Sequence, residues 1–145
     1  MILEAKEKDA EILAEMATKI WENDKISELT EEFMEIAKDE NSTCFLKFID
    51  EKAVAFANVA LRHDYVEGTE TSPVGYLEGV YVKENYRKKG YARELVEACE
   101  KWAIEKNCKE FASDCLLENT DSLKFHLAIG FIEANRIICF KKNLI

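Results

Sequence analysis

Residues 80–95 read VYVKENYRKKGYAREL and combine three patterns in one stretch. Residues 80–82 have the β-branched and aromatic side chains that strands favour, and residues 92–106 repeat apolar side chains at helical spacing. Between them, three cations precede Gly90. A helix start with free N–H groups, a glycine that admits a ligand and nearby cations together favour a bound phosphate. A solvated basic loop has the same composition, so the pattern alone leaves both interpretations open.

The segments on either side of this stretch alternate between strand-like and helix-like patterns. Helices are predicted at 10–21, 27–38, 92–106 and 120–129, and strands at 2–5, 44–50, 53–66, 74–82, 110–116 and, once or twice, within 131–142. The early strands follow one another as in hairpins, whereas the later strands are separated by helices. We therefore expect an α+β fold, with a mixed sheet of six to seven strands and about four helices on its two faces.

Length and charge limit what the protein can be. The 145 residues suit a single domain over 1–145. The formal net charge of −9 disfavours nucleic acid as a partner and favours cationic partners, although solubility alone would also account for it. No apolar run reaches the roughly 18 residues of a membrane span, and the first residues are charged too early for a signal peptide. We expect a cytoplasmic protein without a membrane partner.

The cysteines and histidines show no metal-binding pattern. The five cysteines are Cys44, Cys99, Cys108, Cys115 and Cys139, an odd number without a CxxC pair. Neither of the two histidines has a cysteine at zinc-finger spacing. The pattern indicates small buried side chains in a reducing compartment and no metal cofactor.

Two carboxylates fall in strand-like segments where apolar residues are expected. With a period of two, Glu78 shares a face with Tyr76 and Val80, and Asp114 lies in the predicted strand 110–116. An unpaired buried carboxylate is costly, so each residue is either ion-paired or at a sheet edge, or lies at the floor of a cleft. Both lie near the carboxyl ends of strands, where open α/β sheets bind ligands. Gly79 beside the first carboxylate indicates a bulge or a close approach by a ligand.

Two motifs resemble a known superfamily. A strand followed by R-x-x-G-x-A at 87–92, with the later segment Asn119 to Phe131, is similar to the GNAT superfamily of acyl-CoA-dependent N-acetyltransferases. The runs 64–82 (DYVEGTETSPVGYLEGVYV) and 110–114 (EFASD), with Trp21, more narrowly resemble aminoglycoside 6′-N-acetyltransferases. That resemblance implies a homodimeric resistance enzyme that transfers the acetyl group of acetyl-CoA to the 6′-amine of aminoglycoside antibiotics.

The resemblance also implies residue roles. The backbone of residues 80–82 would hold the pantetheine arm and polarise the thioester carbonyl. The residues implied in CoA binding are Val80, Tyr81, Val82, Arg87, Lys88, Lys89, Gly90, Tyr91, Ala92 and Asn119. Those implied in acceptor binding are Trp21, Tyr65, Glu78, Asp114 and Asn135. Asn135 stands where relatives have glutamate, which would weaken one cation contact or alter substrate preference.

The implied reaction is a direct attack by the amine on the thioester, without metal or covalent intermediate. Glu78 is the candidate general base through water, and a backbone N–H near Val80 would meet the oxyanion. His126 stands where many members have a tyrosine that protonates the departing thiolate, although it can instead pack or bind CoA. Trp21 can be a core residue of the first helix rather than a wall of the pocket.

Two rival functions are compatible with the same residues. The first keeps the fold but acetylates another amine, such as a polyamine or a protein N-terminus. The second is a non-catalytic domain that binds CoA or a cationic partner. The R-x-x-G-x-A loop favours CoA binding but does not by itself establish catalysis.

Overall fold

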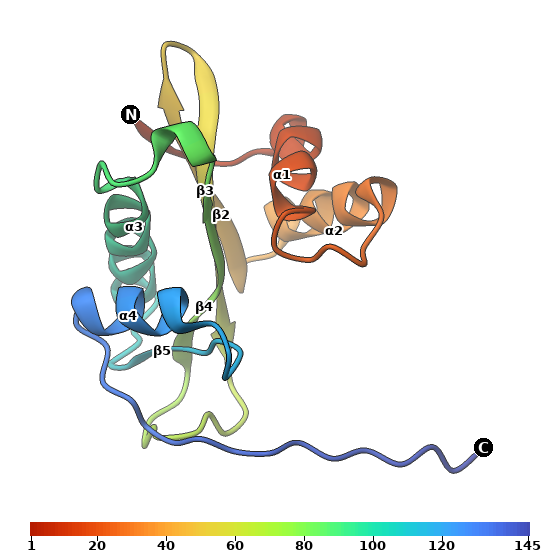
Figure 1. Ribbon diagram of the computed structural model, residues 1–145, viewed down its shortest axis with the longest axis vertical. Helices are drawn as coiled ribbons and strands as arrows, with labels where there is room; N and C mark the ends of the chain where they lie inside the picture. Colours follow the sequence, from red (N-terminus) through yellow and green to blue (C-terminus); the bar gives the residue numbers. More distant parts are fainter.

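One five-stranded sheet organises the computed structural model, which describes residues 1–145 (Figure 1). Its helices and strands are β1 (Ile2–Glu4), α1 (Ala10–Ala17), α2 (Ile26–Lys38), β2 (Ser42–Ile49), β3 (Lys52–Arg62), β4 (Val74–Val82), α3 (Tyr91–Glu105), β5 (Phe111–Ser113) and α4 (Thr120–Ala128), with the 3-10 turns η1 (Glu7–Asp9) and η2 (Glu84–Tyr86). The strands lie in chain order; β1 to β4 are antiparallel neighbours, and β5 is parallel to β4. The predicted mixed sheet is confirmed.

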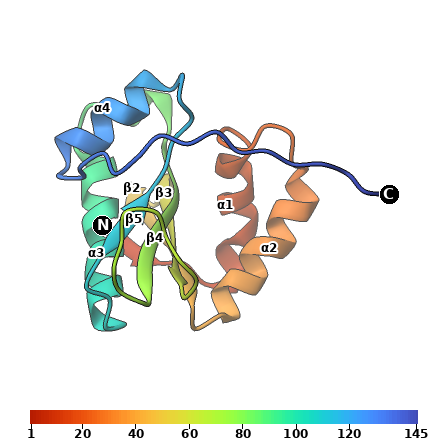
Figure 2. The same ribbon diagram turned by 90° about the horizontal axis from the view of Figure 1, so that it is seen from below.

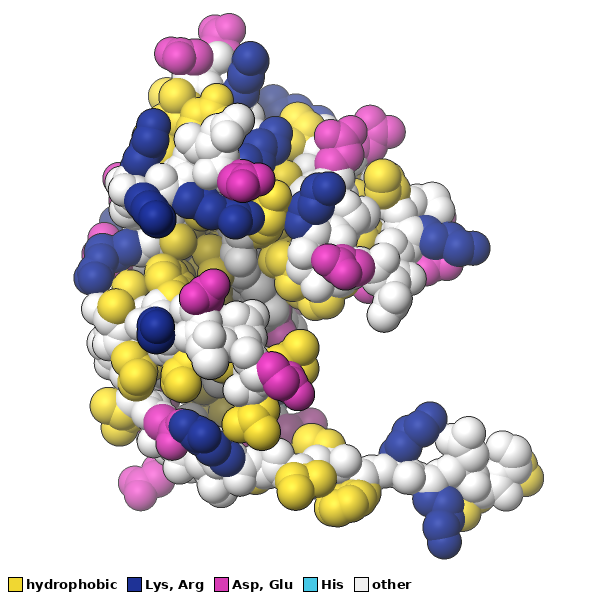
Figure 3. Space-filling model, viewed as in Figure 1, with side chains coloured by type: hydrophobic (Ala, Val, Ile, Leu, Met, Phe, Trp, Pro, Cys, Tyr) yellow, Lys and Arg dark blue, Asp and Glu magenta, His cyan; other side chains and the backbone are white.

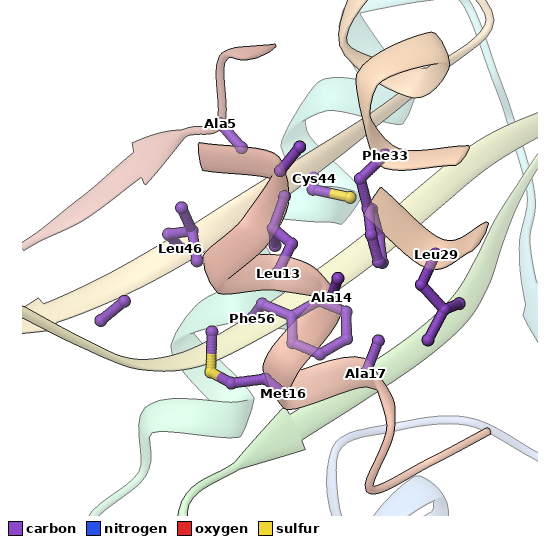
Figure 4. Packing of buried hydrophobic residues seen from close by; sticks show 12 residues of the cluster. Ala5, Leu13, Ala14, Met16, Ala17, Leu29, Phe33, Cys44, Leu46 and Phe56 are labelled. Carbon is purple, nitrogen blue, oxygen red and sulfur yellow. The ribbon is translucent and has the colours of Figure 1, made fainter. Parts of the chain in front are cut away.

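The helices cover both faces of the sheet. Helices α1 and α2 lie on one face, and α3 and α4 lie on the other (Figure 2). On the α1–α2 side, Leu13, Phe33 and Phe56 form a cluster with Leu29 and Leu46 (Figure 4). The Phe33 and Phe56 rings meet edge to face at 5.9 Å between centroids. The opposite cluster packs residues of α3 against β3 and β4; its fully buried members include Val54, Val59, Leu95, Val96 and Cys99.

Strand β4 contains a bulge that changes which face its residues occupy. The pairing between β3 and β4 skips Glu78, which is the extra residue of the bulge. Leu77 and Val80 consequently pack into the same cluster beneath α3 although they are three residues apart. The expectation that Glu78 shares a face with Val80 is therefore wrong, because the bulge inverts the alternation between them. The bulge that Gly79 indicated is confirmed.

The sheet has five strands rather than the expected six to seven. Residues 131–145 contain no strand. Phe131 still stacks on Phe111 of β5, and the chain beyond it extends away from the sheet and helices (Figures 1 and 2). Apart from the partly buried Phe131, the apolar side chains of this segment are exposed, including Ile138 at 80% and Phe140 at 90%. A strand exists only through a hydrogen-bonded neighbour, and within one chain this segment does not pair with an edge of the sheet.

Two smaller expectations also change. Helix α1 ends at Ala17, four residues before the expected end at Trp21, and a series of turns leads from it to α2. Among the cysteines, Cys115 and Cys139 are exposed, whereas the other three are buried as expected. None of the helices combines the length and apolar character that crossing a membrane requires.

Candidate active site

A cleft of about 270 Å³ opens where the α1–α2 turn and α2 face the bulged part of the sheet. It is lined by Trp21, Asp24, Glu32, Phe33, Ile36, Asn58 and Glu78. Three of these side chains are carboxylates and two are aromatic, a combination that suits a cationic ligand with apolar ring faces. In Figure 3 the molecule is hollowed between the helices α1 and α2 and the C-terminal segment, on the side of the α1–α2 turn.

Trp21 reaches the cleft because the chain leaves α1 early and because residue 79 has no side chain. A β-carbon built on Gly79 would lie 3.0 Å from Cη2 of Trp21 and 3.5 Å from Cδ1 of Ile20. Trp21, rather than a ligand, therefore makes the close approach that Gly79 permits. Trp21 packs against the α1–α2 core and lines the cleft, but it does so from the turn after α1, so the interpretation as a core residue of the first helix is wrong. Its part in acceptor binding stays a prediction.

Glu78 is held by an arginine that the sequence did not indicate. Arg62, the last residue of β3, places Nη2 2.9 Å from Oε1 and Nε 3.3 Å from Oε2 of Glu78. Its Cζ lies 3.4 Å from the centroid of the Tyr76 ring. Burial works against the guanidinium charge, but the hydrogen bond and the charge of Glu78 hold the pKa of Arg62 above its ordinary value. Glu78 is thus both ion-paired and part of a cleft.

Asp114 joins the same group of side chains through Tyr76. The Tyr76 hydroxyl donates a hydrogen bond to Oδ2 of Asp114, which follows the short strand β5. Burial and the hydrogen bond to that carboxylate raise the pKa of Tyr76. Asp114 itself is exposed and does not line the cleft beside Glu78. The structure therefore links the two predicted carboxylates through Arg62 and Tyr76 rather than directly.

The strands β4 and β5 separate just beyond this group. Their pairing covers Gly75 to Leu77 only, so the part of β4 from Val80 to Val82 has no β5 neighbour. Its other edge still pairs with β3. An edge with free backbone groups can bind an extended ligand by main-chain hydrogen bonds. Arg87 closes part of this edge, since its Nε donates to the Val82 carbonyl at 2.8 Å.

The basic loop has the geometry of an anion site. Gly90 is the N-cap of α3 in a left-handed conformation with φ 84°, and Lys88 also has a positive φ of 63°. No side chain caps the helix, so its first N–H groups remain free beside the positive end of the helix dipole. A β-carbon at Gly90 would meet nothing within 4 Å, which leaves room for a ligand. Lys and Arg side chains gather over the segment leading into α3 (Figure 3). These features suit the phosphates of CoA.

The predicted residues around α4 have clear structural contacts. Asn119 is the N-cap of α4, and its Oδ1 accepts from the Ser122 backbone N–H at 3.0 Å. His126 places Nε2 2.8 Å from Oγ of Ser113 and Nδ1 2.7 Å from the Ser122 carbonyl. Because a carbonyl only accepts, Nδ1 is the donor to Ser122 and Nε2 of the neutral ring is an acceptor facing Ser113. The Ser113 hydroxyl has one hydrogen, and the Leu77 carbonyl at 3.3 Å is a second acceptor for it.

Two further predicted pocket residues lie outside the cleft, as Asp114 does. Tyr65 is 76% exposed on the loop after β3, where its hydroxyl accepts from the Gly68 N–H at 3.4 Å. Asn135 donates from Nδ2 to Glu67 on the same loop at 2.8 Å. Both contact this loop rather than Glu78 or Trp21, and their part in acceptor binding stays a prediction.

Sequence reasoning missed Asp24, Glu32 and Arg62. The two carboxylates lie in segments rich in charged residues, where nothing in the spacing distinguishes a cleft residue from a solvated one. Arg62 could have been found from register, because an arginine that ends one strand lies across from the strand that carries Glu78. That signal requires the strand pairing to be known.

Comparison with known proteins agrees with this geometry. The family model described as the Acetyltransferase (GNAT) family matches residues 10–131. An aminoglycoside N(6′)-acetyltransferase type 1 from Serratia marcescens is 39% identical over 130 residues, which cover 89% of each chain.

Solved structures show the same likeness over nearly the whole chain. The aminoglycoside N-acetyltransferase AAC(6′)-Iy in complex with CoA superposes with a TM-score of 0.95 at 34% identity, over 98% of this chain and 93% of that one. The same enzyme with the bisubstrate analogue CoA-S-monomethyl-acetylneamine gives a TM-score of 0.94 at 34% identity, over 99% and 97% of the two chains.

Proposed function

Because this chain belongs to the acetyltransferase (GNAT) family, we propose that it transfers the acetyl group of acetyl-CoA to the 6′-amine of aminoglycosides and thereby confers resistance. The observation that carries the proposal is the pair of sites along β4. An acidic cleft flanks the bulge, and an uncapped basic helix start follows the end of the strand. Relatives named as aminoglycoside N(6′)-acetyltransferases, and one bound to an analogue that joins CoA to an aminoglycoside, support this acceptor.

The basic loop and the free edge of β4 would bind acetyl-CoA. Backbone N–H groups between Arg87 and Ala92 would hold the phosphates, and the edge from Val80 to Val82 would hold the pantetheine arm. The backbone near Val80 would also meet the oxyanion that forms when the amine attacks the thioester. We keep Asn119 as a CoA contact in addition to its cap of α4.

The acidic cleft would bind the acceptor as a cation and prepare its amine. Glu78 is the proposed general base, acting through water on the ammonium proton. Trp21 offers a ring face for a sugar, while Asp114, Tyr65 and Asn135 would contact more distant groups of the acceptor.

His126 is the proposed donor of a proton to the departing thiolate. When its ring is protonated, Nε2–H can donate to Oγ of Ser113, whose own hydrogen can pass to the sulfur. The neutral ring and the thiol of CoA remain afterwards, so one proton is transferred in total. The hydroxyl of Ser113 lies where β4 and β5 separate, because Ser113 is the last residue of β5 paired with β4.

We further propose that the enzyme is a homodimer, with residues 1–145 acting as one acetyltransferase domain in the cytoplasm. The exposed apolar side chains of 131–145 support a second copy, since four apolar residues in a row at 137–140 suit a strand covered on both faces. Five free cysteines suit a reducing compartment. Removing residues 137–145 should convert the dimer to a monomer in analytical ultracentrifugation. An intact chain that sediments as a monomer would contradict the dimer.

The test of the function is acetyl-CoA turnover with matched acceptors. CoA thiol release should occur with aminoglycosides that carry a 6′-amine and not with analogues that have a hydroxyl there. Release with polyamines or peptides alone would favour the rival acetyltransferase. Binding of acetyl-CoA without release for any amine would favour a non-catalytic domain.

A further inference from the structure

The contacts of Arg62 resemble those that a bound ammonium group would make. Its guanidinium contacts both carboxylate oxygens of Glu78, with hydrogen bonds of 2.9 to 3.3 Å. It also stacks on the Tyr76 ring, whose hydroxyl donates to Asp114. Glu78 lines the cleft, and Arg62 itself does not. Arg62 therefore places a cation of the protein itself on Glu78, and Glu78 is the one cleft carboxylate that forms an ion pair.

The pair is exposed enough to exchange partners. The side chains of Arg62 and Glu78 are 43% and 27% exposed, and ion pairs of this kind contribute little net stability in water. After leaving Glu78, the guanidinium can stay on the Tyr76 ring, near the carboxylate of Asp114. Arg62 thus has a second set of contacts, which lowers the cost of its displacement.

We infer that Arg62 is a built-in competitor that lowers the affinity for acceptors: it occupies the ammonium subsite of Glu78 in the free protein, and an acceptor must displace it. This rests on the proposed function and names a competitor within that same site. The displacement costs about the same for every acceptor that places an ammonium group on Glu78, so it raises KM for all of them by a similar factor. A polycation can offset this cost, because the cleft also offers Asp24 and Glu32 to its other ammonium groups.

The charge-removing variant Arg62→Gln tests the inference directly. It should lower KM for a 6′-amino aminoglycoside about two- to fivefold, the range expected of an exposed ion pair. Its kcat and its KM for acetyl-CoA should change by less than about twofold. Arg62→Lys keeps the charge but loses the two-pronged contact, and should give an intermediate KM. KM for a weakly charged amine that uses Glu78 should fall by a similar factor.

Competition by methylguanidinium is a measurement that would show no effect if Arg62 had a purely structural role. In Arg62→Gln it should compete with the aminoglycoside and raise KM toward the wild-type value, whereas sodium chloride at the same concentration should raise it less. Lys52→Gln is the matched control, because it removes one cation at the opposite end of β3. Its KM for the aminoglycoside should equal that of wild type.

An unchanged or higher KM in Arg62→Gln, together with a lower kcat, would overturn the inference and make Arg62 a positioning residue for Glu78. Calorimetric Kd values for the aminoglycoside keep this outcome separate from the proposed function. If wild type binds the aminoglycoside but releases no CoA, the proposed function fails, and tighter binding by Arg62→Gln would still support the competition. Equal binding by both proteins would refute it.

Discussion

The two sites along β4 are built in opposite ways. The basic loop comes from six consecutive residues, and its backbone carries the binding groups. The acidic cleft comes from the α1–α2 turn, α2, β3 and β4, and its side chains carry the charge. A contiguous backbone site depends on the conformation at one or two positions, whereas the cleft depends on packing among distant segments. Substitutions should therefore separate acetyl-CoA binding from acceptor binding.

Glu78→Gln should give the largest difference between its effect on acceptor turnover and its effect on acetyl-CoA binding. Loss of the general base should lower kcat about 10²-fold or more, while KM for acetyl-CoA stays near the wild-type value. The amide keeps the size of the side chain, so the melting temperature should change little. Steady-state kinetics with both substrates varied will measure this effect.

Glu35→Gln is the control for Glu78→Gln, because Glu35 forms only an exposed pair with Lys38 at 4.0 Å. It should behave as wild type. A Glu78→Gln enzyme with wild-type kcat would show that the base is another group or is not needed.

The second prediction concerns Gly90→Val. A β-branched residue at φ 84° is strained by about 1–2 kcal/mol, so the loop should lose the conformation that exposes the first N–H groups of α3. KM for acetyl-CoA should rise roughly tenfold, and calorimetric binding of the aminoglycoside should not change. An equal loss of affinity for acetyl-CoA and for the aminoglycoside would mean that the two sites are not independent.

How well each site could be predicted follows from this difference in construction. The strand 74–82 and the loop before α3 were predicted with nearly correct bounds, because their patterns are local. Glu78 stood out as a carboxylate in an apolar strand, but the pattern left an ion pair, a sheet edge and a cleft open as explanations. Its partner Arg62 was missed, since only the β3–β4 pairing brings the two together.

The C-terminal strands show a different limit. The apolar residues near Ile138 have the composition of a strand, yet the segment is unpaired within one chain. An apolar composition indicates that a segment packs against a partner, but it does not identify the chain that supplies this partner. The early end of α1 was missed for a related reason, because Trp21 packs on Gly79 of β4 from a turn rather than from a helix.

A third prediction uses that contact. In Gly79→Ala the new β-carbon would lie 3.0 Å from the Trp21 ring, so the ring must shift within the cleft. We expect KM for the aminoglycoside to rise about threefold and the free energy of unfolding to fall by about 1 kcal/mol. Tryptophan fluorescence titrated with aminoglycoside will follow the ring. Unchanged acceptor KM would show that Trp21 packs without contacting substrate.

The smallest effects should come from the carboxylates that sequence reasoning missed. Asp24→Asn and Glu32→Gln should each raise KM for the aminoglycoside about two- to fourfold, since each removes one attraction to a cation at an open cleft. Both effects should shrink as salt is raised, and KM for acetyl-CoA should not respond. If the two carboxylates attract the acceptor independently, the double variant should show the product of the two changes. If the acceptor instead binds only through Glu78, both single variants should match wild type. Glu78 would then be the one carboxylate of the cleft that binds the acceptor, in competition with Arg62.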